Sequence, residues 1–461
     1  MSPRRLLPLV ALLATAALPS TAPAKTSFQR IAGFDSPGTP AKYNKVGILK
    51  IGAPTAKNVL VLNPGTSASA AYFAPLAKAI VARAKSWQVW SVERRENLLE
   101  DHSVLDKVKA GTATVDNAFD YYLGYIKDSS ISPHFTTIPD ASVAYAKQWG
   151  MNTEIQDLRR VVLRAAKLGG KVVVGGHSLG GSITSAYATW DFDGTAGAKG
   201  LSGLVFIDGA SSPTPITPDE AQAKLDALNA SDASPWLSFG GIPAPYTGLF
   251  NSTGALATLL APHEKSRGQD SGLLPSNLVP PVPATNAGLY GYALDTETSP
   301  ASLAAAQGHL GHLAETGEIR DWVNGGELTP IARFATMFSG FGLKGLDGTA
   351  WYHPQRLTID SGVVAAGNNN AGQAIMDVHA THGADLPRKL RMLAFGAALG
   401  GSRVLDATKA LAAQSKISTS RLVLIDGSAT YAHNDPNSAS PAKNEFLKAL
   451  VPFLAKVAPK R

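Results

Sequence analysis

Short apolar runs alternate with longer stretches of helical periodicity along this chain. The runs are rich in Val, Ile and Leu, and we predict strands at 45–51, 58–62, 87–92, 172–174, 201–207, 390–396 and 422–425. Between and after them, apolar residues recur at helical spacing over 70–83, 155–165, 404–413 and 446–453. This alternation is typical of a mostly parallel sheet flanked by helices.

One strand and helix pair carries a recognisable catalytic motif. Thr153 to Gln156 forms a capping box that predicts a helix start, and Gly169-Gly170 ends that helix before the run Val172 to Val174. The sequence then reads GHSLG, a G-x-S-x-G motif centred on Ser178. A strand before it and a helix after it predict a sharp turn that exposes the serine hydroxyl above the sheet.

A second turn is expected beside this serine. The predicted strand 58–62 is followed by Asn-Pro-Gly-Thr-Ser and then by a helix. In this position the backbone N–H of Thr66 or Ser67 is a candidate oxyanion donor, with the N–H of Leu179 as the second donor.

A histidine near the end of the chain is the candidate general base. His433 follows the last predicted strand, in the sequence Tyr-Ala-His-Asn-Asp. A residue at the carboxyl end of an outer strand can reach back to a serine on a middle strand of a parallel sheet. We therefore take His433 as the candidate general base.

The chain changes character between 211 and 385. This stretch of about 175 residues is rich in Pro, Gly and Ala, too long for a loop and too apolar for a linker, so we predict a helical lid or cap. The sheet-bearing core is then expected at 25–210 and 386–461. Aromatic residues available to line an apolar cleft there are Trp236, Phe239, Tyr246, Phe250, Phe334 and Phe338. The charged run 93–97 is predicted as a solvated surface, with a position facing the active site as the alternative.

Composition and charge narrow the class of protein. Among 461 residues, 44% are apolar and 17% charged, which fits an ordinary globular protein. Arg4 and Arg5 lie in an N-terminal segment that we expect to be removed, and without them 40 basic residues stand against 35 acidic ones, a net charge of +5. No Lys/Arg-rich cluster occurs, so we expect no nucleic-acid partner. Cysteine is absent, which excludes thiol catalysis and disulfides.

The first 24 residues have the order of an export signal. Arg4 and Arg5 precede a short apolar run from Leu6 to Leu18, and Ala22-Pro23-Ala24 offers a cleavage site. We predict a signal peptide at 1–24 and a secreted or extracytoplasmic protein. An uncleaved anchor stays open.

Together, the Pro-Gly-Thr-Ser turn, the GHSLGG elbow, the large insertion and the late histidine resemble the α/β-hydrolase family, especially its lid-bearing secreted lipases and esterases. The resemblance covers 45–208 and 390–461 and does not extend to the insertion. It implies that Ser178 is the nucleophile and His433 the base, with the N–H groups of Thr66 (or Ser67) and Leu179 as oxyanion donors.

The triad acid is less well determined by the sequence. The family commonly places it after the penultimate strand, where the first carboxylate here is Asp406. Asp208 ends the strand that follows the nucleophile strand, and some similar lipases take their acid from that strand. We predict Asp208, with Asp406 as one alternative. Three carboxylates of the insertion also stay open: Asp360, Asp377 and Asp385.

Two histidine-rich segments are alternatives for metal binding. One is His309-x-x-His312-x-x-Glu315, which places three ligands on one face if the segment is helical. The other segment holds Asp377, His379, His382 and Asp385. Glycines weaken a helix in both, and we expect neither metal nor cofactor.

Two functional classes follow. The first is a secreted serine hydrolase that cleaves carboxylic esters, with small-molecule or lipid esters as substrates and amide or thioester bonds as related targets. The second is an exported, non-catalytic protein that binds an apolar ligand or a cell-envelope partner. Acyl length and oligomeric state stay open.

Overall fold

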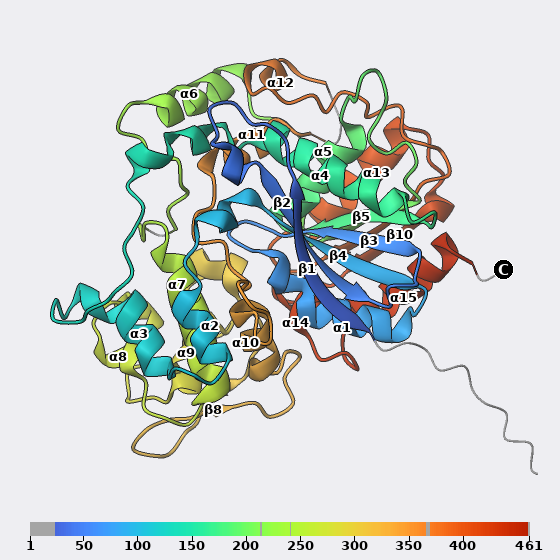
Figure 1. Ribbon diagram of the computed structural model, residues 1–461. Coiled ribbons are helices and arrows are strands. Elements are labelled where there is room, and N and C mark those ends of the chain that lie inside the picture. The colour runs from blue at the N-terminus through green and yellow to red at the C-terminus, as the bar shows by residue number, and fades with distance from the viewer. Residues whose placement is uncertain (1–23, 213, 240, 366–368, 460–461) are drawn as a thin grey trace, which may run out of the picture.

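The computed structural model describes residues 24–212, 214–239, 241–365 and 369–459, which build one large sheet with helices on both faces (Figure 1). Residues 1–23 of the predicted signal peptide lie outside the described residues. Within the described ranges, no helix has both the length and the apolar character needed to cross a membrane.

The sheet has eight strands in the order β1-β2-β4-β3-β5-β6-β9-β10. The strand β2 pairs antiparallel with both β1 and β4, and the other neighbours are parallel. The strands are β1 (Lys25–Ala32), β2 (Lys45–Gly52), β3 (Asn58–Asn63), β4 (Trp87–Glu93), β5 (Val172–His177), β6 (Gly203–Ile207), β9 (Arg391–Gly396) and β10 (Leu422–Asp426). All the predicted strands are confirmed. The edge strand β1 was not predicted.

Alternate residues of the strands pack into two hydrophobic cores, one on each face of the sheet. In β3, Val59 and Val61 belong to one core, whereas Leu60 and Leu62 belong to the other. Because both faces are covered, the central strands are apolar at nearly every position. The first core includes α4 (Met151–Ala166), α5 (Leu179–Thr189) and α13 (Ser402–Gln414), and the second includes α1 (Ala74–Arg83) and α15 (Glu445–Val457) (Figure 1).

The helices of the stretch 211–385 are separated by long irregular segments and lie in two places. One group lies near α4 and α5, and the other forms a lobe beside the sheet (Figure 1). The first group is α6 (Pro218–Asn229), α11 (Gln355–Ser361) and α12 (Ala371–Ile375). The lobe contains α7 (Tyr246–Leu260), α8 (Arg267–Asp270), α9 (Asn286–Leu294), α10 (Ile331–Ser339), β7 (His312–Leu313) and β8 (Trp322–Val323).

An earlier part of the chain joins this lobe. The helices α2 (Ser103–Lys109) and α3 (Val115–Tyr122) pack against α7 and share a third hydrophobic cluster with it. Tyr122 and Trp351 lie inside this cluster with rings 5.7 Å apart. The lobe is thus built from two separate segments of the chain.

The predicted capping box at Thr153 is wrong. The helix α4 begins at Met151, so Thr153 lies inside its first turn and its hydroxyl donates to the carbonyl of Gln148 at 3.0 Å. The Met151 N–H donates instead to Asp360 Oδ2 at 2.8 Å. A carboxylate from a distant helix therefore replaces the local cap, and a Cβ on Gly150 would lie 2.1 Å from that oxygen.

Candidate active site

Ser178 occupies a strained turn between β5 and α5. Its backbone has φ 56° and ψ −126°, a conformation that costs a non-glycine residue on the order of 1–3 kcal/mol. The turn is held by the Ser178 N–H, which donates to the carbonyl of Ile207 at 3.0 Å. A Cβ on Gly176 would lie 2.1 Å from the carbonyl oxygen of Gly180. The glycines thus allow strand and helix to approach closely around the serine.

His433 is paired with Asp208. Its Nδ1 lies 2.6 Å from Asp208 Oδ2, and both side chains are buried. The other carboxylate oxygen, Oδ1, accepts hydrogen bonds from the N–H groups of Ala397 at 2.6 Å and Gly400 at 2.9 Å. Because Asp208 occupies Nδ1, Nε2 is the ring nitrogen left for proton exchange.

The surroundings keep Asp208 ionised. Burial by itself would raise the pKa of its carboxyl group, but the hydrogen bond and charge of His433 and the N–H of Ala397 outweigh burial and lower the pKa. An ionised carboxylate accepts the Nδ1 proton of His433 and fixes the orientation of the ring.

The other candidate acids have different partners. Asp406 is exposed and pairs with Lys409 at 2.9 Å. In the insertion, Asp360 binds Arg356, Asp377 binds His379, and Asp385 binds His382. Of the five carboxylates considered from the sequence, Asp208 is the one that contacts His433 in the described structure.

Ser178 lies next to this pair. The ring of its neighbour His177 is 4.3 Å from the ring of His433. Within the described residues, the Ser178 hydroxyl and His433 Nε2 are not hydrogen-bonded to each other. Catalytic hydrogen bonds are often long without substrate and tighten when it binds.

The turn after β3 faces the serine. A Cβ on Gly65 would lie 2.9 Å from Ser178 Cβ, so the backbone passes directly over the nucleophile. Of the two predicted donors in this turn, Ser67 already gives its N–H to His353 Nδ1 at 3.3 Å. Thr66 is therefore the better candidate. Leu179 is the first residue of α5, and its N–H has no acceptor within the helix.

The charged run 93–97 is buried, so its prediction as a solvated surface is wrong. Arg94, with 1% of its side chain exposed, donates to the carbonyls of Pro64, Gly65 and Ala68 at 2.9–3.0 Å and to Glu96 at 2.6 Å. This guanidinium ties the end of β4 to the turn that carries Thr66. One feature of the sequence pointed to this burial. The charges follow directly after a buried strand, β4, which neighbours the strand that leads into the turn.

A polar network behind His433 was missed in the sequence. His177 Nε2 donates to the carbonyl of His433 at 2.8 Å, and its Nδ1 lies 3.1 Å from the hydroxyl of Tyr72. That hydroxyl also donates to Asn434 at 2.5 Å and accepts from Asn437 at 2.9 Å. Burial lowers the pKa of His177 to about 3, so its ring is neutral and supports the His433 loop as a donor.

Asp435 anchors the same loop from the other side. Its buried carboxylate accepts from Thr329 Oγ1 and the Ala432 N–H at 2.7 Å, and lies 2.6 Å from His309 Nδ1. The hydrogen bond to Asp435 raises the pKa of His309. His309 is thus engaged here. His312 lies in β7, so the helix required by the His309-His312-Glu315 alternative does not form.

The sheet and this site together define an α/β-hydrolase fold. The second strand runs antiparallel to its neighbours in an otherwise mostly parallel sheet, and the serine sits on a strand-to-helix elbow at its middle. The candidate residues follow in the chain order Ser, Asp, His that is typical of this fold. The predicted fold class is confirmed.

Comparisons with known proteins find only distant similarity. No family model and no curated protein sequence matches the chain. Among solved structures, a putative lipase from Sulfolobus solfataricus is 14% identical, with a TM-score of 0.49 and coverage of 95% of this chain and 98% of that one. The thioesterase domain from the curacin biosynthetic pathway is 10% identical, with a TM-score of 0.40 and coverage of 94% and 99%. An epoxide hydrolase from an endophytic Streptomyces is 13% identical, with a TM-score of 0.40 and coverage of 94% and 96%. Because these identities are so low, we infer the chemistry of this chain from its own site residues.

Proposed function

We propose that this protein is a secreted serine hydrolase that cleaves carboxylic esters through an acyl-enzyme on Ser178. The observation that carries the proposal is the buried Asp208–His433 pair beside a serine held in a strained elbow. This combination of an exposed-hydroxyl turn, an oriented imidazole and an ionised carboxylate is what serine acyl transfer requires.

In the first half of the reaction, Ser178 Oγ attacks the ester carbonyl carbon while His433 Nε2 takes the hydroxyl proton. The N–H groups of Thr66 and Leu179 stabilise the negative oxygen of the tetrahedral intermediate, and each such donor is worth roughly 3 kcal/mol. The intermediate then re-forms its carbonyl, the carbon–oxygen bond to the leaving group breaks, and His433 gives its proton to the leaving oxygen, so that an alcohol departs. The acyl group stays on Ser178.

In the second half, water attacks the acyl carbon while His433 removes its proton. The tetrahedral intermediate collapses, Ser178 recovers its proton from His433, and the carboxylic acid leaves. Asp208 stays ionised throughout and stabilises the imidazolium in both halves.

An apolar cavity in the lobe supports an apolar substrate. It has a volume of about 180 Å³ and includes Phe119, Phe250, Leu294 and Leu303 in its lining. Two of its lining residues, Leu303 and Ala306, belong to a segment that contacts the loop of His433, because the Asn434 amide donates to the carbonyl of Ala305 at 3.1 Å. We propose that this cavity accepts an acyl chain, and Phe250 is one of the aromatic residues predicted to line such a cleft.

The insertion also contacts the oxyanion turn. The Ala350 N–H donates to the Ser67 carbonyl at 2.9 Å, and the Ser69 N–H donates to the Gly348 carbonyl at 3.2 Å. These contacts support the proposal that the stretch 211–385 acts as a cap that influences substrate choice.

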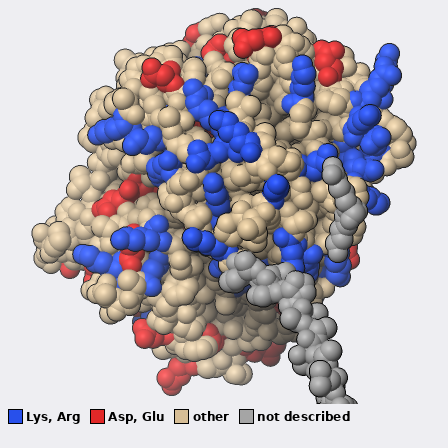
Figure 2. All heavy atoms as spheres, turned by 45° about the vertical axis from the view of Figure 1, so that its right-hand side comes forward, with Lys and Arg blue, Asp and Glu red and all other residues tan. Residues whose placement is uncertain are grey.

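Export and partners are part of the same proposal. Residues 1–24 are proposed to direct secretion, and association with the cell envelope is compatible with an ester substrate found there. On the face seen in Figure 2, Lys and Arg side chains are spread among uncharged residues and do not form one stripe. Such a distribution does not favour nucleic acid as a partner.

A chromogenic ester series from acetyl to palmitoyl tests this function. We expect medium or long acyl esters to be preferred, with no turnover by Ser178→Ala or His433→Ala, since nucleophile and base act as a unit. Activity of Ser178→Ala within tenfold of the wild type would contradict the nucleophile assignment. A preference for acetyl or charged esters would contradict the apolar cap.

A further inference from the structure

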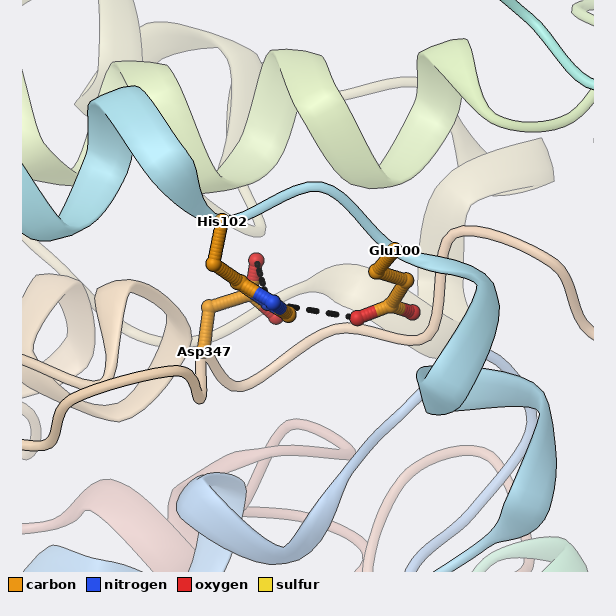
Figure 3. Close-up of side chains that lie close together, drawn as sticks. All are labelled: Glu100, His102 and Asp347. Atoms are coloured by element: carbon orange, nitrogen blue, oxygen red, sulfur yellow. Dashed lines mark ion pairs between the residues drawn. The ribbon is translucent and has the colours of Figure 1, made fainter. Parts of the chain in front are cut away.

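A second cluster of ionisable side chains, separate from Ser178, His433 and Asp208, lies between the core and the lobe. Glu100 follows β4, His102 directly precedes α2, and Asp347 belongs to the loop after α10 (Figure 3). Among the described residues, this is the group of three whose ligand atoms all lie within 4.8 Å of one another. The side chains of Glu100 and Asp347 are fully buried, and that of His102 is 8% exposed.

The imidazole of His102 points between the two carboxylates (Figure 3). Its Nε2 lies 3.2 Å from Glu100 Oε2 and 3.7 Å from Asp347 Oδ2. Despite this proximity, Nε2 is a buried polar atom whose contacts do not have the geometry of a hydrogen bond. The nitrogen forms ion pairs with both carboxylates (dashed lines in Figure 3) but no well-shaped hydrogen bond, and a buried polar atom of this kind requires an explanation, such as an ion shared by the three side chains.

The separations fit a metal ion. Zinc binds imidazole nitrogen and carboxylate oxygen at about 2.0–2.2 Å, so neighbouring ligands of a tetrahedral site lie roughly 3.4 Å apart. The two separations measured from His102 Nε2 fall on either side of this value. Three protein ligands would leave a fourth position open.

The two carboxylates are already oriented by further hydrogen bonds. Trp351 donates its backbone N–H to Glu100 Oε1 at 2.7 Å and its indole N–H to Asp347 Oδ2 at 2.9 Å. The hydroxyl of Ser252 also donates to Asp347 Oδ2 at 2.8 Å. Such outer partners are what positions the ligands of metal sites.

We propose that Glu100, His102 and Asp347 bind one divalent transition-metal ion of the zinc type. An imidazole nitrogen together with carboxylate oxygens suits this class, whereas calcium and magnesium prefer oxygen ligands alone. The site joins the segment after β4 to the loop at Asp347. That loop also holds the oxyanion turn, since the Ser69 hydroxyl donates to the Asp347 carbonyl. The ion therefore stabilises the contact between lobe and core whether or not the protein hydrolyses esters.

Zinc binding to the untagged full chain tests the proposal. After dialysis against a chelator, titration calorimetry with Zn²⁺ should show one equivalent bound, and plasma mass spectrometry should recover one ion per chain after desalting. The melting temperature should rise by roughly 3 °C at a hundredfold excess over Kd. The wild-type protein binding no zinc would overturn the proposal and leave a buried ion triad.

Variants assign the ion to these residues. His102→Gln and Asp347→Asn should each lose the bound equivalent while the far-ultraviolet circular dichroism stays that of a folded protein. The matched control is His382→Gln, because His382 also lies between two carboxylates, Asp191 at 3.2 Å and Asp385 at 2.8 Å, but on the surface. Loss of the ion in His382→Gln with retention in His102→Gln would overturn the assignment. If His102→Gln does not fold, Glu100→Gln replaces it, and the wild-type titration stays decisive.

Discussion

Replacing Asp208 by Asn changes one atom and should stop turnover through the tautomer of His433. The N–H groups of Ala397 and Gly400 both donate to Asp208 Oδ1. Because they cannot accept a proton, they will select the carbonyl oxygen of the new Asn side chain. Its NH₂ group then faces His433 Nδ1, which must become an acceptor. The proton moves to Nε2, and His433 can no longer take the proton of Ser178.

The size of the effect follows from this forced tautomer. A comparable carboxylate-to-amide change in a serine protease lowers kcat about 10⁴-fold with the geometry intact. We expect Asp208→Asn to lose roughly 10³- to 10⁴-fold in kcat, or about 4–5 kcal/mol of transition-state stabilisation. The fold should persist, since the two backbone donors keep their acceptor.

The assay compares kcat of Asp208→Asn and Asp406→Asn on the best ester of the acyl series. Asp406 is exposed and pairs with Lys409, so its variant should be close to the wild type. Turnover of Asp208→Asn within tenfold of the wild type, with Asp406→Asn impaired, would refute the reasoning and move the acid to Asp406.

Three further predictions concern the surroundings of the site. Arg94→Lys should lower kcat at least tenfold and the free energy of unfolding by about 3 kcal/mol, because one ammonium cannot bind three carbonyls and Glu96. The control Arg95→Lys disturbs the neighbouring buried pair with Asp157, and it should lower the free energy of unfolding without this loss of kcat. Burial raises the pKa of Glu93 from 4.5 to about 8, so the folded state keeps a proton that the unfolded chain releases, and the melting temperature should fall between about pH 5 and pH 8. Glu93→Gln should reduce this fall, and a variant with the same pH dependence of melting temperature as the wild type would contradict the shift. Ala293→Trp should fill the apolar cavity and move the acyl preference toward shorter esters, and an unchanged chain-length profile would remove this cavity from substrate binding.

The strands and the elbow were predictable because their signals are local. Apolar runs between glycines give the strands, and the spacing of glycines around Ser178 gives the turn. The edge strand β1 was not predicted because its eight residues include Lys25, Gln29 and Arg30, and none of them is fully buried. The signal of a half-exposed strand is too weak in such a sequence.

Features that depend on distant partners were not predictable in the same way. Arg94 and Glu96 look like surface charges until the carbonyls of the turn after β3 are placed around them. Thr153 has the sequence pattern of a helix cap, but the first N–H of the helix donates to Asp360, which comes from another helix. The Glu100–His102–Asp347 cluster joins segments that no spacing rule connects.

The identity of the triad acid also depends on a contact between distant parts of the chain. Chain order favoured Asp406, and strand position favoured Asp208. The contact with His433 depends on where the loop after β10 folds back, which the sequence does not state.

Covalent labelling of Ser178 by a fluorophosphonate probe is the most direct test of the central claim. Such a probe reacts with a serine whose hydroxyl is activated by a neighbouring base. Peptide mass spectrometry of the folded wild-type protein should find one probe adduct, on Ser178, and Ser178→Ala should carry none. A folded wild-type protein that stays unlabelled, or one labelled at another serine, would contradict the proposed acyl-enzyme; the unlabelled result would favour a non-catalytic protein that binds an apolar ligand.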